Sequence, residues 1–391
     1  MFNMLNRKDL IYFGFLNIVF LLVYIYVWVT LGYPDENFVF NTFDSQSYRS
    51  SGAWLFGSGA GEYINIRPFL FPLIVYIFNF LFSFHGIFWV NTLLWFVTGN
   101  IVLLSVWQLT KSRYWVFVSC MFYVSELSLI ALCGHGLTEI YVAFFTSLIV
   151  FLYIKSNQSK KYYIHICWIL SILSCVKPVF LSFYLLIFII YLFNISKEKK
   201  LNTYIFLTLL PILLQITIYT SKYHKVGFSE IGKIALNRYY FAQGTSNLHH
   251  ISFDSARVVV KDYNTIQTFS TIMSNPVVYF NTYLDLLHEN FDGDPIYFTF
   301  PDRHEKLYIY TKQLNHMKFY LHLILIIPLL FVFVKRKELR FLIILFSYMV
   351  LTTGLSFKQG DRYATPIVAI WAVLYCAVFT LKSSQEQKLT V

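Results

Sequence analysis

Long apolar runs separated by short polar segments dominate the chain. The runs lie at 10–31, 68–84, 87–109, 115–134, 139–154, 163–193, 201–221, 317–334, 340–356 and 364–381. A helix that crosses a bilayer needs roughly 20 predominantly apolar residues, so most of these runs are long enough to cross. The run 163–193 is too long for one crossing and holds Lys177-Pro178 at its centre. It predicts two helices joined by a tight turn, which makes eleven apolar segments in all.

The run 68–84 determines the predicted topology. The short basic loops lie at 110–113, 155–161, 196–200 and 334–340. If 68–84 crosses the membrane, these loops lie on the side opposite Arg7 and Lys8. If it lies flat on the membrane surface, they all join the N-terminus on the cytoplasmic side, as the positive-inside bias requires. We therefore expect a flat helix at 68–84, about ten crossings, and both termini in the cytoplasm.

The polar segments divide the chain into three parts. Residues 1–221 form an N-terminal transmembrane module, whose first outer loop, 33–86, holds most of the candidate chemistry. Residues 222–316 form a polar insert of helical pieces broken by Gly and Pro, which we expect to fold over the outer face as a cap. Residues 317–391 supply the last transmembrane helices. The predicted fold class is an all-α polytopic membrane protein.

The composition excludes a soluble domain. Hydrophobic residues make up 57% of the chain and charged residues 13%, with a mean hydropathy of +0.57. The net charge of +11 does not indicate nucleic-acid binding, because the basic residues cluster in short loops between apolar runs. The five cysteines lie in or beside apolar runs without metal-ligand spacing, as is typical of buried thiols. Glu126 lies deep in the run 115–134, where a carboxylate must be paired or neutral.

The first outer loop contains the main candidate residues. Asp44 and Tyr48 share a face of a short juxtamembrane helix predicted at 44–56. Asp44 suits two roles, the N-cap of this helix and a catalytic acid or base. Arg67 directly precedes Pro68 and lies in extended backbone. It is either an interfacial anchor or a ligand for phosphate, which a guanidinium binds through two parallel donors.

Further candidates lie at other outer turns of the predicted bundle. His135 and Glu139 precede the fourth crossing, where a carboxylate also suits the positive end of a helix. Lys177, Arg362 and Tyr363 lie at hairpin tips beside prolines. Each cation alone is typical of a membrane boundary. Together with Arg67, these groups are suited to a phosphate site.

Several short motifs occur along the chain in an order that resembles a known family. The motifs are Asp44 with Tyr48, RPFLFP at 67–72, LTE at 137–139, KP at 177–178 and GDRYATP at 360–366. The chain resembles the GT-C superfamily of membrane glycosyltransferases, in particular the branch with aminoarabinose transferases and protein O-mannosyltransferases. The resemblance covers roughly residues 10–200 and the motif before the last crossing.

This resemblance implies an inverting glycosyltransferase at the outer face of a bacterial inner membrane. It makes Asp44 the general base and Glu139 a second catalytic acid of the outer loops. Arg67 would bind the donor phosphate, and Arg362 with Tyr363 would contact donor or acceptor. The candidate donor- and acceptor-binding residues are Tyr48, Arg67, His135, Lys177, Arg362 and Tyr363. The loop has a lone Asp44 where larger relatives have an acid pair, which argues against a divalent cation as cofactor.

The expected partners are a polyprenyl-phosphate-linked sugar, a glycan or lipid-linked acceptor such as lipopolysaccharide, and membrane lipids. Two other functions remain open at the level of sequence. A lipid-linked glycan flippase or other transporter is expected to show inverted repeats and polar residues at mid-membrane, whereas the ionisable groups here gather outside. An O-antigen polymerase is expected to have arginine-rich outer loops, whereas the large loop here has mixed charge.

Overall fold

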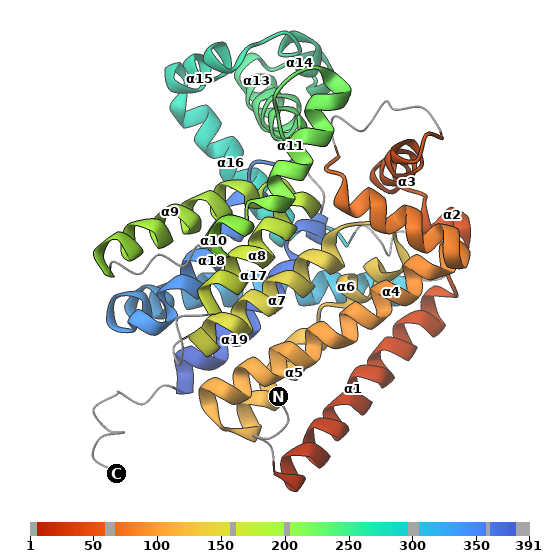
Figure 1. The fold of residues 1–391 in the computed structure, drawn as a ribbon, viewed down its shortest axis with the longest axis vertical. Coiled ribbons are helices and arrows are strands. Elements are labelled where there is room, and N and C mark those ends of the chain that lie inside the picture. The colour runs from red at the N-terminus through yellow and green to blue at the C-terminus, as the bar shows by residue number, and fades with distance from the viewer. Residues whose placement is uncertain are drawn as a thin grey trace.

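The architecture is helical throughout the described part of the chain. The computed structural model describes residues 6–58, 67–156, 162–198, 204–295, 305–356 and 360–380. Within these ranges every regular element is a helix, and no strand occurs. Figure 1 shows a bundle of long helices, with α11 rising from it to a smaller group of helices, α13, α14 and α15, at one end. The predicted all-α class is confirmed.

Six helical segments are long and apolar enough to cross a membrane. They are α1 (Arg7–Leu31), α4 (Leu70–Thr110), α7 (Glu139–Ser156), Tyr204–Tyr223 with α10 and α11, α17 (Glu305–Lys335), and Gly360–Phe379, which ends in α19. A bent pair, α5 (Arg113–Val124) with Leu127–Gly134, makes seven if it counts as one span. The chain is therefore an integral membrane protein. The expected ten crossings are not confirmed, because other apolar runs form shorter helices among the described residues, including α8 (Tyr162–Val176) and α18 (Arg340–Thr353).

Helix α1 shows how these helices pack. Leu16, Phe20, Tyr24 and Val27 lie on one buried face, at spacings of three to four residues. The opposite face is also apolar, and it exposes side chains such as Leu22 and Val29. A helix that is apolar on its exposed side is suited to lipid and not to water.

Helix α4 contains a sharp break at Phe82 and Ser83, where the backbone leaves helical geometry. A methyl group on Gly86 would lie 2.5 Å from the carbonyl oxygen of Phe78. Eight residues of continuous helix would span about 12 Å, so the chain folds back here. The limb before the break packs closely on α3. A methyl group on Gly52 of α3 would lie 2.4 Å from the carbonyl oxygen of Pro72. The expected separation of 68–84 from the following helix is therefore found at this break, and Figure 1 shows the two limbs running in different directions.

Two further interruptions place polar groups inside the bundle. The segments Arg113–Val124 and Leu127–Gly134 meet at an angle of 60° beside Glu126. Glu126 is buried, and its Oε1 lies 2.8 Å from Lys318 Nζ, which supplies the partner that a deep carboxylate requires. The run 163–193 divides at Lys177-Pro178 into α8 and α9 (Phe180–Glu198), as expected.

The juxtamembrane helix predicted at 44–56 is α3 (Phe43–Leu55), which follows the short α2 (Glu36–Val39). Its N-cap is Thr42, whose hydroxyl accepts from the backbone of Ser45 in a capping box. The interpretation of Asp44 as the N-cap is therefore wrong, because Asp44 lies inside the first turn. The Asp44 carboxylate does not cap the helix, and it bonds other groups that are described below.

The insert after α11 (Leu210–Tyr223) has a small core of its own. It contains α12 (Ile231–Ala235), a π-helix (Leu236–Phe241), α13 (Ala242–His249), α14 (Phe253–Val259), α15 (Thr265–Ser274) and α16 (Pro276–Phe291). Phe241 stacks on Tyr279, and a cluster of apolar side chains surrounds them. We call residues 231–291 the cap. Helix α17 begins at Glu305, inside the segment 222–316 that was expected to form the insert.

Several expected features fall outside the described residues. These are the loop 59–66, residues 157–161 and 199–200 of two basic loops, and the polar tail 381–391. All five cysteines are buried, as the sequence predicts.

The fold-back in α4 leads to a prediction about stability. Replacing Gly86 with Ala should lower the free energy of unfolding by about 1–3 kcal/mol, because the new methyl group meets backbone and cannot be relieved by a side-chain rotation. Gly14→Ala is the matched control, since a methyl group there meets nothing within 4 Å. Denaturation in mild detergent measures both variants. Equal stability of the two proteins would contradict the fold-back.

Candidate active site

Asp44 lies at the centre of a network of ion pairs. Its Oδ1 accepts a hydrogen bond from Arg67 Nη2, and its Oδ2 accepts one from Arg362 Nη1 at 2.6 Å. Arg67 also donates through Nε to the Ser47 hydroxyl at 3.0 Å and lies over the ring of Tyr48, 4.6 Å from its centroid. Arg67 is thus turned into the protein, which excludes the interfacial anchor as its role.

Glu139 extends the network on the other side of Arg362. Arg362 Nε donates to Glu139 Oε1 at 2.9 Å, and Lys177 Nζ lies 3.7 Å from the same oxygen. Glu139 begins α7, as predicted, yet its side chain serves these cations and is fully buried. Lys177 also lies over the ring of Tyr363, 4.6 Å from its centroid. One chain of contacts therefore joins α3, α7, the α8–α9 turn and the turn before α19.

The charges in this network strongly affect one another. Burial by itself raises the pKa of the Asp44 carboxyl, but Arg362 and Arg67 outweigh burial and hold this pKa well below its ordinary value. Burial lowers the pKa of the Lys177 ammonium, while the nearby Glu139 opposes that shift. The network thus keeps Asp44 ionised and makes the charge on Lys177 depend on its partners.

The network lines a cavity of about 290 Å³ beneath the cap. The bundle contributes Asp44, Tyr48, Arg67, Thr138, Glu139, Lys177, Arg362 and Tyr363, and the cap contributes Ile231, Ile234, Ala235, Arg238, Tyr239 and Arg257. Five basic and two acidic side chains are among the lining residues, so the cavity is suited to an anion. We call it the polar cavity.

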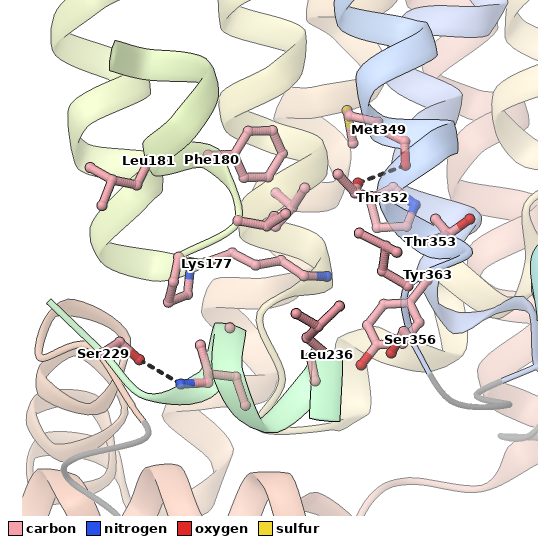
Figure 2. Close-up of a pocket in the computed structure, with 18 of the residues that line it drawn as sticks. Lys177, Phe180, Leu181, Ser229, Leu236, Met349, Thr352, Thr353, Ser356 and Tyr363 are labelled. Carbon is pink, nitrogen blue, oxygen red and sulfur yellow. Dashed lines mark hydrogen bonds between the residues drawn. The ribbon is translucent and has the colours of Figure 1, made fainter. Parts of the chain in front are cut away.

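A second cavity of about 350 Å³ adjoins the polar cavity, and we call it the apolar cavity. The two share Lys177, Pro178, Ile231, Ala235, Ser356 and Tyr363 as lining residues. Figure 2 shows the apolar cavity between α9, α18 and the cap, with Lys177 reaching across it toward Tyr363. Side chains such as Phe180, Leu236 and Met349 form its other walls. A charged group and an apolar chain can therefore be bound side by side.

The structure brings together seven of the eight residues selected from the sequence. Asp44, Tyr48, Arg67, Glu139, Lys177, Arg362 and Tyr363 all line the polar cavity. His135 does not line it. This imidazole is fully buried and stacks on Phe38, with 4.6 Å between ring centroids, and burial lowers its pKa to about 3. His135 is therefore neutral and packs behind the site.

The sequence interpretation missed two groups of residues. Arg238, Tyr239 and Arg257 reach the polar cavity from the cap, and the first two belong to the π-helix, an element frequent at functional sites. No short motif marked them, because their position depends on how the cap docks.

The second missed group supports the turn that carries Arg362. Asp361 is buried, and its Oδ2 accepts from the Ser128 hydroxyl and, at 2.8 Å, from the amide of Asn315. The motif GDRYATP did contain Asp361, but its partners lie 233 and 46 residues away in the sequence.

Comparisons with known proteins give no relative. No family model matches the chain, and searches of curated proteins and of solved structures found no significant match. In the described residues, no group of three or more His, Cys, Asp or Glu side chains is arranged to hold a metal ion. The function must therefore be inferred from the site itself.

The buried network predicts a large difference between two arginines. Arg362→Ala should lower the free energy of unfolding by about 3–5 kcal/mol, because it leaves the Asp44 and Glu139 carboxylates short of a partner away from water. Arg49→Ala removes a pair with Glu36 whose side chains are 45% and 52% exposed, and should cost about 0–1 kcal/mol. Thermal denaturation in detergent tests the comparison. Similar losses in the two variants would show that the network does not stabilise the fold.

Proposed function

We propose that this protein is an inverting glycosyltransferase that moves a sugar from a polyprenyl-phosphate donor to an acceptor hydroxyl. We place the reaction at the outer face of a bacterial inner membrane, with a surface glycan or glycolipid as acceptor. One observation carries the proposal: a carboxylate that faces a cavity rich in cations, which directly adjoins an apolar cavity. A lipid-linked sugar phosphate matches this arrangement, because its phosphate lies between the sugar and the apolar chain. The sugar would lie toward the carboxylate, the phosphate among the cations and the chain in the apolar cavity.

The reaction requires opposite charges on its two sides. The bond between the anomeric carbon and the donor phosphate oxygen breaks, and the acceptor oxygen forms the new bond from the opposite face. The phosphate leaves with its electron pair, while the acceptor hydroxyl loses its proton to a base. A carboxylate on the acceptor side and cations on the phosphate side stabilise this charge development.

The structure supports different roles for the two carboxylates. The Asp44 side chain is 24% exposed and lines the polar cavity, so an acceptor hydroxyl can reach it. The Glu139 side chain is completely buried, and it holds Arg362 and Lys177 in place. We assign Asp44 as the base that takes the acceptor proton. Glu139 then acts by positioning the cations.

The two cavities suggest how the donor is held. Lys177 lies on the wall between them, with Tyr363 beside it. A phosphate at Lys177 would direct the first prenyl units into the apolar cavity and the sugar toward Asp44. Arg67 and Arg362, which present planar guanidinium groups, are suited to a phosphate in the same place.

Donor binding would also activate the base. Without donor, Arg67 and Arg362 bond both oxygens of Asp44, so this carboxylate is a weak base. An incoming phosphate competes for the guanidinium groups and adds negative charge beside Asp44. Both effects raise the pKa of Asp44 and strengthen it as a base. The carboxylate therefore becomes reactive once the donor is in place.

The proposal predicts that Asp44→Asn lowers the transfer rate by roughly 10²–10⁴-fold, because an amide cannot take the acceptor proton. The assay uses purified protein in lipid with a panel of polyprenyl-phosphate sugars, and follows release of the sugar from the carrier. Glu36→Gln, an exposed acid of the same outer loop, is the control and should keep full activity.

Transfer by Asp44→Asn at close to the wild-type rate would remove the base assignment. If neither the wild type nor the variant transfers any sugar, but both move lipid-linked sugar across the bilayer, the protein is a flippase.

The pH dependence gives a separate test. Asp44 must be ionised to act, so activity is lost as the pH falls through its pKa. This pKa is depressed in the free protein, so kcat/KM should stay constant far into the acid range. Donor binding raises the pKa, so kcat should begin to fall at a higher pH than kcat/KM. Coincident acid limbs, with the protein shown to be folded by tryptophan fluorescence, would contradict activation by the donor.

A further inference from the structure

The cap has an apolar face that nothing in the described chain covers. Its members on α15 are Ile266, Phe269 and Met273, and its members on α16 are Val277, Phe280 and Leu284. On each helix the three are spaced by three or four residues and so share a side. They are between 43% and 81% exposed. We call these six residues the cap apolar face.

The opposite side of α15 anchors this helix in the cap. The buried Thr268 donates to the side-chain oxygen of Asn237, and Ile272 packs on the cap core. Asn264 and Gln267 form a capping box at the start of the helix. The exposure of Ile266, Phe269 and Met273 is therefore fixed by the fold and not by fraying of the helix.

The cap apolar face is continuous with the apolar surface of the bundle. Helix α16 leads from α15 back to the bundle (Figure 1). At the end of α18 the hydroxyl of Tyr283 donates to the carbonyl of Leu351 at 2.8 Å, and the Leu351 side chain is exposed there. The exposed side of α18 is apolar and includes Ile344 and Leu351, so the surface near its end is suited to lipid.

The composition of this segment indicates which surface it meets. Residues 263–284 contain no Asp, Glu, Lys, Arg or His. Aromatic and aliphatic side chains such as Phe269 and Ile266 can therefore enter the boundary between head groups and acyl chains without carrying a neighbouring charge into it. A soluble partner would be expected to meet a rim of polar and charged groups around the apolar centre. Lipid chains, which are fluid, can also fill the open hollow along Ile266, Phe269 and Met273.

We propose that the cap apolar face inserts into the lipid leaflet at which α18 ends. The membrane then holds the cap in place over the polar cavity, since the π-helix with Arg238 packs on α15 and α16. The cap is thus an interfacial module. It is not a domain that projects freely into water.

The test places a fluorescent label on the cap apolar face. Phe269→Cys is labelled with an environment-sensitive nitrobenzoxadiazole group, which is selective because the five native cysteines are buried. In phosphatidylcholine nanodiscs the emission should shift to the blue and fall by about twofold when doxyl-labelled phosphatidylcholine is included. Val258→Cys is the matched control: this valine of α14 is 72% exposed but adjoins Arg257, and its label should respond to iodide in water instead.

Each result decides the proposal. Lipid quenching at position 269, repeated at Ile266→Cys, with none at 258, supports it. Iodide quenching at position 269 equal to that at 258 overturns it, as does lipid quenching that is equal at both. Protection at position 269 that grows with the protein-to-lipid ratio and shows no lipid quenching overturns it in favour of a second copy of this chain. None of these outcomes depends on whether the protein transfers a sugar.

Discussion

The pairing of Arg362 with Asp44 and Glu139 is the constraint on which the site depends. It joins positions 318 and 223 residues apart in the sequence, and most of the side-chain surface of the three residues is removed from water. Any one of these charges alone would be very costly to bury, and each is tolerated because the others are present. The network therefore fixes α3, α7 and the turn before α19 relative to one another. The same contacts that hold the fold also set the geometry of the polar cavity.

This arrangement connects stability with the proposed chemistry. In the described structure the guanidinium groups of Arg67 and Arg362 are paired with Asp44, and in the proposed reaction a donor phosphate would compete for them. Part of the binding energy is then used to separate internal pairs, which leaves Asp44 as a stronger base. A site of this kind restrains its base until the donor arrives.

The sequence predicted the helical class, the division of the run 163–193 and seven residues of the polar cavity, because apolar period, proline and rare charges are local signals. It failed where tertiary contacts decide. Thr42, and not Asp44, caps α3, because the helix begins at Phe43 and places Asp44 inside its first turn, where the carboxylate pairs with Arg67. The expected ten crossings are not confirmed, because a long apolar run does not by itself fix where a helix ends or bends, as the shorter α8 and the bent pair beside Glu126 show. Arg238 and Arg257 could not be predicted as cavity residues, because no local sequence pattern indicates where the cap packs on the bundle.

The positive charges of the bundle and of the cap differ in the free energy needed to remove them from water. Arg67, Lys177 and Arg362 are largely removed from water, so each needs a carboxylate in the bundle and their positions cannot change independently. Arg238 and Arg257 reach the same cavity from a surface that is open to solvent, where a cation costs little desolvation. Substitutions in the cap can therefore alter which anionic group is accepted without unbalancing the buried network. In the proposed transferase, the bundle would define the reaction and the cap would adjust which anionic donor is bound.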